Sequence, residues 1–316
     1  MKKTGRQFLV FLALLVLFAQ VPCMNQRVSA AAKTTTEKKT TVKTTKKKNG
    51  LYKEGNGKFC YYQNNKRIKN TWKTIKGGKY YFDKNGYALI GSSKVGRTLY
   101  LFRADGKLYK RNRNGFVKVL GNTYYVLKSG ELRTGWIGLG NSIYYADSRG
   151  RILRNATREG VKLNKDGKAV KVTQRVRLHA YARNVLVSVT NSRMTRSEKL
   201  KACFRYIVSC NYGDGGDFVG GSNWDVYYGS RVLSRRRGDC FGFGCAVAYL
   251  ADAVGYTSYA VSSGGHGWAE VNGKVYDANW AKVTGKIDGY CGMSYDLSGR
   301  GGRPNYKPNR AYVKRI

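Results

Sequence analysis

Residues 237–256, RGDCFGFGCAVAYLADAVGY, join a turn to a long apolar run and decide the fold of the C-terminal half. After Cys240, apolar residues recur at helical spacing, and Gly255 provides a stop signal. The preceding residues, Arg237-Gly238-Asp239, break that pattern. Cys240 is therefore predicted at the first turn of a mostly buried helix, where free N–H groups and the helix dipole favour a thiolate. This position makes Cys240 a candidate nucleophile, with a disulfide or core cysteine as the alternative.

A nucleophilic cysteine needs a base, and the chain has two histidines. His179 has no partner pattern around it and is expected to be structural. His266 precedes Asn272-Gly273, a strong two-residue hairpin signal. A two-residue loop places His266 and Asp277 on one face as diagonal neighbours, so the carboxylate can orient the imidazole toward a thiolate. A loop one residue longer would invert the faces.

Three short motifs resemble those of the transglutaminase-like superfamily in their order and spacing. They are Gly238-Asp239-Cys240, Gly265-His266-Gly267-Trp268 and Tyr276-Asp277-Ala278-Asn279-Trp280. The resemblance covers roughly residues 190–285 and includes an amphipathic helix expected over 196–208. It implies a papain-like α+β fold in which Cys240 is the nucleophile, His266 the base and Asp277 its orienter. Family members transfer acyl groups either to water or to amines. The absence of an identifiable acceptor motif slightly favours a peptidase or amidase over an amine crosslinker.

The remaining chemistry is less marked in the sequence. The backbone N–H of Cys240 can supply one oxyanion contact, and Asn223 or Trp224 is a candidate for the second. Six cysteines remain beyond the first 32 residues, an even number that permits disulfides, although a nucleophilic Cys240 leaves at least one thiol free. No metal-ligand spacing or phosphate-binding glycine motif is present. No metal or cofactor is expected.

Residues 50–169 carry an internal repeat of about 20 residues. Each copy places an aromatic pair between two turns, which predicts one β-hairpin per repeat. The pairs are Tyr61-Tyr62, Tyr80-Tyr81, Tyr100/Phe102, Tyr124-Tyr125 and Tyr144-Tyr145, and the Gly-led turns before them are Gly57-Lys58, Gly78-Lys79, Gly96-Arg97, Gly121-Asn122 and Gly140-Asn141. Since one hairpin is marginal alone, stacked copies sharing a core are expected to form an elongated hairpin solenoid.

This pattern resembles the cell-wall-binding repeats of Gram-positive surface proteins, of the choline- and glucan-binding type. In that family Trp and Tyr side chains of neighbouring repeats cage a ligand, and aromatic faces suit a quaternary ammonium or a sugar ring. The departure here is that only two Trp remain in the repeats. The corresponding candidates for a wall ligand are Trp72, Tyr80, Tyr81, Tyr124, Tyr125, Trp136, Tyr144 and Tyr145. The alternative is a spacer whose aromatic residues only pack.

The N-terminal end predicts export. A charged start, an apolar run from Phe8 to Ala19 and small residues at 29–32 are the order of a secretory signal peptide over residues 1–32. An uncleaved anchor is the alternative. Residues 33–49 contain seven Lys and one Glu among Thr residues and are expected to be a disordered linker. No later stretch is apolar enough for a membrane span.

The formal net charge of +41 favours anionic partners. For an exported protein these are a wall polymer or an anionic cell surface rather than nucleic acid. The predicted organisation is a multidomain chain: signal peptide (1–32), linker (33–49), β-hairpin repeat solenoid (50–169) and α+β transglutaminase-like domain (170–316). The predicted function is a secreted, wall-associated cysteine enzyme acting on amide bonds of a peptide or protein. The alternative is a noncatalytic wall-bound adhesin.

Overall fold

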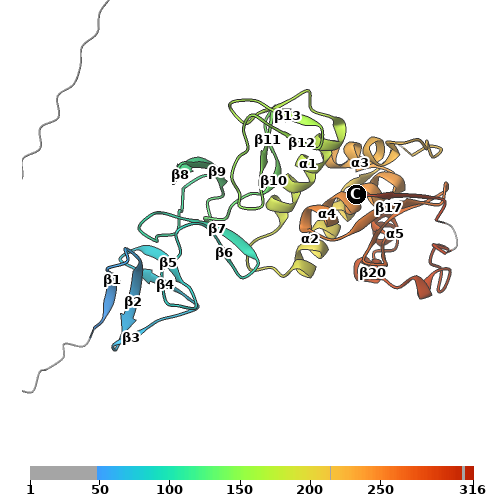
Figure 1. The fold of residues 1–316 in the computed structure, drawn as a ribbon. Helices are drawn as coiled ribbons and strands as arrows, with labels where there is room; N and C mark the ends of the chain where they lie inside the picture. The colour runs from blue at the N-terminus through green and yellow to red at the C-terminus, as the bar shows by residue number, and fades with distance from the viewer. Residues whose placement is uncertain (1–47, 214, 308–309) are drawn as a thin grey trace, which may run out of the picture. The chain divides into compact units, whose positions relative to one another are not determined.

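The computed structural model describes residues 48–213, 215–307 and 310–316 (Figure 1). The predicted signal peptide (1–32) and, apart from Lys48 and Asn49, the predicted linker (33–49) lie outside the described residues. None of the helices in the described ranges is long and apolar enough to cross a membrane.

The first half of the described chain is a series of antiparallel hairpins, as the aromatic repeat predicted. Four of them are built alike, with five residues in each strand: β4 (Thr71–Ile75) with β5 (Gly78–Phe82), β6 (Gly91–Val95) with β7 (Thr98–Phe102), β8 (Gly115–Val119) with β9 (Asn122–Val126), and β10 (Gly135–Leu139) with β11 (Ser142–Ala146). Three-stranded sheets flank them: β1 (Gly50–Lys53), β2 (Phe59–Gln63) and β3 (Lys66–Arg67) before, and β12 (Ala156–Arg158), β13 (Val161–Leu163) and β14 (Ala169–Val170) after. In every copy the predicted aromatic pair lies on the second strand.

Two of the predicted turns begin earlier than expected. Lys76-Gly77 and Leu120-Gly121 form the loops of their hairpins, and all four residues have positive φ, which is the type I′ pattern. Glycine belongs at the second position of such a turn rather than the first, so Gly78 begins strand β5 instead of the turn. Gly96-Arg97 and Gly140-Asn141, with positive φ at the glycine, are the loops predicted.

A backbone ladder links each hairpin to the one before it. The segment after each second strand donates a hydrogen bond back to the previous copy, as from Leu108 N to Lys79 O (2.7 Å) and from Ile152 N to Thr123 O (2.8 Å). The rings and aliphatic side chains between copies are buried, with Phe82, Phe102 and Val126 at 0% exposure. The prediction that stacked hairpins share a core is confirmed.

The second half contains helices around an antiparallel sheet. The helices are α1 (Gln174–Val189), α2 (Arg196–Val208), α3 (Trp224–Arg235), α4 (Cys240–Val254) and α5 (Ala278–Thr284). The five strands run in the order β20 (Cys291–Met293), β19 (Lys274–Tyr276), β18 (Gly267–Val271), β17 (Ser258–Ser262) and β21 (Tyr312–Arg315). The predicted helix over 196–208 agrees with α2, whose buried residues form the expected face.

Helix α4 is the centre of this half and touches α1, α2, α3, α5, β17 and β18 (Figure 1). Every residue from Cys240 to Ala251 is buried, and Gly255 ends the helix in the left-handed conformation. Glycines let the helix lie directly on strand β18. A Cβ at Gly244 would lie 2.7 Å from the backbone of Trp268, and one at Gly267 would lie 2.6 Å from Cα of Phe241. The start of α4 and the start of β18 are thereby held side by side.

The variant Gly244→Ala should destabilise the protein by about 2–3 kcal/mol, because the new methyl group meets backbone that cannot move aside. Urea denaturation followed by tryptophan fluorescence measures this. Gly216→Ala is the matched control, since a Cβ there meets nothing within 4 Å. Equal unfolding midpoints for the two variants would contradict the close approach.

Candidate active site

Cys240 is the first residue of α4, as predicted, and its side chain is buried at 7% exposure. Asp239 caps the helix, and its carboxylate accepts a hydrogen bond from Gly242 N at 2.7 Å. The cysteine thus lies at the N-terminal end of a 15-residue helix, where the free N–H groups and the helix dipole stabilise negative charge on sulfur.

His266 lies in the turn that joins β17 to β18, one residue before β18 begins. Ser263 holds this turn, since its N–H donates to His266 O (2.9 Å) and its Oγ accepts from His266 N (3.0 Å). The imidazole is largely buried and stacks at 6.2 Å from the Trp268 ring. The hairpin interpretation of the sequence predicts His266 within a strand. In the structure it lies one residue before the strand begins.

Asp277 follows β19 and caps α5, and it is fully buried. Its Oδ1 accepts from Trp280 N at 2.9 Å, and its Oδ2 lies 2.6 Å from His266 Nε2. The hairpin register that predicted this meeting is confirmed: Val271 pairs with Lys274 across Asn272-Gly273, whose two residues have positive φ. Because Nε2 faces the carboxylate, Nδ1 is the ring nitrogen left for Cys240.

The surroundings of His266 favour its charged form. Burial alone would lower its pKa, but the hydrogen bonds to Asp277 and Cys240 outweigh burial and raise the pKa of His266 to about 9. At neutral pH the ring is therefore an imidazolium, held between a buried carboxylate and the sulfur. This is the state that can give a proton to a leaving group while stabilising a thiolate.

Two tyrosines that the sequence motifs did not indicate also lie at this site. Tyr306 is fully buried and donates to Asp277 Oδ2 at 2.6 Å, although it lies beyond residues 190–285. Tyr212 lies in β15 (Asn211–Tyr212), which pairs in parallel with β16 (Arg237–Gly238) just before Cys240. Burial and the neighbouring Cys240, to which its hydroxyl hydrogen-bonds, raise the pKa of Tyr212. Neither tyrosine stands in a pattern that sequence reasoning recognises.

Asn223 and Trp224, the two candidates for a second oxyanion donor, contact other residues in the structure. The side-chain oxygen of Asn223 accepts from Arg175 Nη2 at 3.3 Å, and the ring of Trp224 is buried against Phe218. The other predicted histidine, His179, lies on α1 with its Nδ1 3.4 Å from Asp252 Oδ2. The contact with Asp252 supports a structural role for His179.

All six cysteines in the described ranges are free thiols, and five of them are buried. Cys291 is the half-buried one, and burial raises its pKa to about 11. Among residues 48–213, 215–307 and 310–316, no group of His, Cys, Asp and Glu could hold a metal ion.

The aromatic candidates of the repeats divide into buried and accessible rings. Tyr80, Tyr124 and Trp136 are 2–4% exposed, so their rings fill the repeat core rather than face a ligand. The accessible rings form three-ring sets across neighbouring hairpins. One set is Trp72, Tyr81 and Tyr100, and another is Phe116, Tyr125 and Tyr144; Tyr145 packs on Trp136. Phe116, 38% exposed, was missed because it lies outside the aromatic pairs.

Comparison with known proteins bears on the repeats. Residues 70–88, which contain β4 and β5, match a family model described as a putative cell wall binding repeat. The resemblance expected from the sequence is confirmed for these residues. No curated protein matches the chain.

Several solved structures resemble part of the chain. Choline binding protein F from Streptococcus pneumoniae is 30% identical over 39% of this chain and 40% of that chain, with a TM-score of 0.30. CbpJ from Streptococcus pneumoniae TIGR4 is 27% identical over 39% and 41%, with a TM-score of 0.30. The modular autolysin LytC from Streptococcus pneumoniae is 20% identical over 39% and 28%, with a TM-score of 0.28. The chain spans less than half the length of each of these structures. The transglutaminase-like resemblance of residues 190–285, and the catalytic domain predicted over 170–316, stay predictions.

The raised pKa of His266 has a measurable consequence. In NMR spectra of the two histidines, the His266 ring should titrate at about pH 9 and shift toward its usual pKa of 6.5 in Asp277→Asn. Because the folded-state pKa is the higher one, the stabilisation from the charged ring is complete below pH 6.5 and lost as pH rises through about 9. Tyr306→Phe should lower the pKa of His266 less than Asp277→Asn does. Titration of both histidines near pH 6.5 in the unmodified protein would contradict the pairing.

Proposed function

We propose that this protein is a wall-associated cysteine enzyme that cleaves or transfers amide-linked acyl groups, with a transglutaminase-like C-terminal region. The single observation that carries the proposal is the placement of His266 between Asp277 and Cys240, with Cys240 at the start of α4. A buried helix-start cysteine beside an oriented imidazole is the arrangement that activates a thiol as a nucleophile.

The reaction follows from these groups. The Cys240 thiolate attacks the carbonyl carbon of an amide, and the imidazolium of His266 gives its proton to the leaving amine. A thioester remains on Cys240. The neutral imidazole then takes a proton from water, whose oxygen displaces the sulfur and releases the carboxylic acid. An amine in place of water gives a crosslink, and hydrolysis is slightly favoured, since no acceptor-site motif is identifiable.

Two groups have supporting roles in this proposal. The Cys240 N–H and the Tyr212 hydroxyl lie beside the sulfur and are the donors proposed for the oxyanion of the tetrahedral intermediate. Tyr306 holds Asp277 through its hydroxyl, so the carboxylate is fixed relative to the imidazole. Tyr306 is a positioning residue rather than a catalytic one.

The nucleophile is tested by limited alkylation. Iodoacetamide at about pH 6 should label Cys240 selectively, because an ordinary thiol with a pKa of about 8.5 reacts slowly there. Peptide mapping by mass spectrometry identifies the labelled residue. Cys291 is the internal control: it is the more exposed thiol, but its pKa is about 11. His266→Ala should slow the labelling of Cys240.

Activity variants separate the roles. Cys240→Ala should abolish both hydrolysis of a peptide amide and incorporation of a fluorescent primary amine, and Tyr212→Phe should lower turnover roughly 100-fold while Cys240 remains alkylated. The ratio of hydrolysis to amine incorporation in the unmodified protein assigns the acceptor. Unselective labelling together with no turnover would favour the noncatalytic alternative.

The second candidate function is a wall-binding protein without catalysis. It is favoured by the match of residues 70–88 to a putative cell wall binding repeat, a finding that concerns the repeats alone. We propose that the repeats bind a wall polymer in either case. The similar proteins named above include choline binding proteins, and a choline group suits the three-ring set of Phe116, Tyr125 and Tyr144.

Wall binding is tested by cosedimentation of the purified protein with isolated Gram-positive cell walls. Phe116→Ala should weaken binding several-fold, since one ring in contact with a cation contributes about 1 kcal/mol. Tyr52→Ala, in the first repeat sheet, is the control for an exposed aromatic outside the set. Free choline should compete. Binding that is unchanged in Phe116→Ala would exclude this set as the ligand site.

A further inference from the structure

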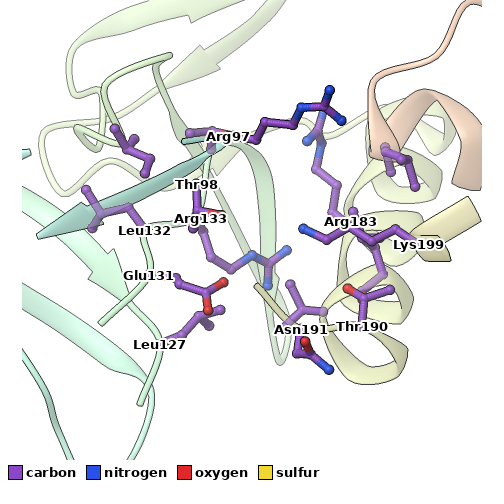
Figure 2. Close-up of a pocket in the computed structure, with 16 residues that line it drawn as sticks. Arg97, Thr98, Leu127, Glu131, Leu132, Arg133, Arg183, Thr190, Asn191 and Lys199 are labelled. Carbon is purple, nitrogen blue, oxygen red and sulfur yellow. The ribbon is translucent and has the colours of Figure 1, made fainter. Parts of the chain in front are cut away.

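A cavity of about 280 Å³ lies between the repeats and the helices. It shares no lining residue with the site around Cys240. On the repeat side it is lined by the β6–β7 turn and residues 131–134, and on the other side by α1, α2 and the end of α4 (Figure 2). No motif in the sequence indicated it, because its walls come from five separate segments.

The charged lining is strongly basic. Four cations face one carboxylate: Arg97, Arg133, Arg183 and Lys199 against Glu131. Within the described ranges, none of the four cations has a carboxylate within ion-pair distance. With Glu131 as the one carboxylate against four cations, the cavity lining carries an excess of positive charge.

Arg133 is a buried cation of this lining with an unpaired hydrogen-bond donor. It is only 8% exposed, and its guanidinium points from the repeat side into the space between the two walls (Figure 2). Its Nη1 donates to Asn184 Oδ1 at 2.9 Å, but its buried Nη2 has no hydrogen-bond partner among the described residues. Arg183 Nε is buried and unpartnered in the same way. A buried donor without a partner costs free energy, most of all on a charged group.

The pKa of Arg133 also reflects its burial beside another cation. Burial and the neighbouring charge of Arg183 lower the pKa of Arg133 to about 10, against an opposing influence of Tyr125. Two cations held close together in a poorly solvated space repel each other, and an anion between them would relieve both the repulsion and the unmet hydrogen bonds.

We propose that this cavity binds a phosphate group. Guanidinium groups match phosphate oxygens with paired hydrogen bonds, and a multiply charged, tetrahedral anion suits cations that approach from separate elements better than a flat carboxylate does. The volume admits a phosphate with a small substituent, as in a phosphomonoester or one unit of a phosphodiester polymer. A bound phosphate would tie the repeats to helix α1 through Arg133 and Arg183.

The test is phosphate binding by the full mature protein, measured by calorimetry and by Tm at constant ionic strength. Inorganic phosphate should bind and raise Tm relative to chloride. Arg133→Met should weaken phosphate binding about 10- to 100-fold, the range for hydrogen bonds to a charged group. The phosphate-free Tm of this variant should stay equal or rise, because removing a buried charge that has no carboxylate partner offsets the loss of its hydrogen bond to Asn184. A merely structural role for Arg133 predicts the opposite, a lower Tm in every buffer.

Arg113→Met, an exposed arginine of the repeats outside this cavity, is the matched control and should respond to phosphate like the unmodified protein. Arg183→Met provides a second variant if Arg133→Met fails to fold. Glycerol 3-phosphate and poly(glycerol phosphate) then separate a free phosphate ester from a polymeric source. Equal effects of phosphate and chloride, or a full phosphate response in both Arg133→Met and Arg183→Met, would overturn the proposal.

Discussion

The contact between helix α4 and strand β18 is the constraint on which the candidate active site depends. A side chain at Gly244 would meet the backbone of Trp268, and one at Gly267 would meet Cα of Phe241, so the helix backbone lies directly on the strand. This approach brings the helix start, with Cys240, next to the strand entry, with His266. A larger residue at either glycine would move Cys240 away from His266 without changing either side chain.

The polar groups of the site are held by neighbours that are themselves buried. Asp277 caps α5 through one carboxylate oxygen and contacts both His266 and Tyr306 through the other. A fully buried carboxylate is tolerated because each oxygen is hydrogen-bonded. The contact with Asp277 also raises the pKa of His266 and so favours the charged imidazolium.

At the junction between the repeats and the helices, some buried polar groups lack hydrogen-bond partners. Asn184 of α1 accepts from Arg133 and donates to Gly138 O of β10, which attaches the last repeats to the first helix. Yet Arg133 and Arg183 keep buried donors without partners there. Both oxygens of Asp277 are hydrogen-bonded within the protein, whereas these two arginines, which line the cavity, each keep a buried nitrogen without a partner.

The sequence by itself determined the local structure: hairpins from aromatic pairs between glycine turns, helix α4 from its apolar run, and the β18–β19 register from Asn272-Gly273. These depend on periodicity and turn chemistry, which neighbouring residues carry. Only the tertiary structure decided that Tyr212 and Tyr306 join the site, that Trp136 is buried, and that four cations converge on one cavity. Those contacts join segments far apart in the chain, and no local pattern encodes which distant side chains meet.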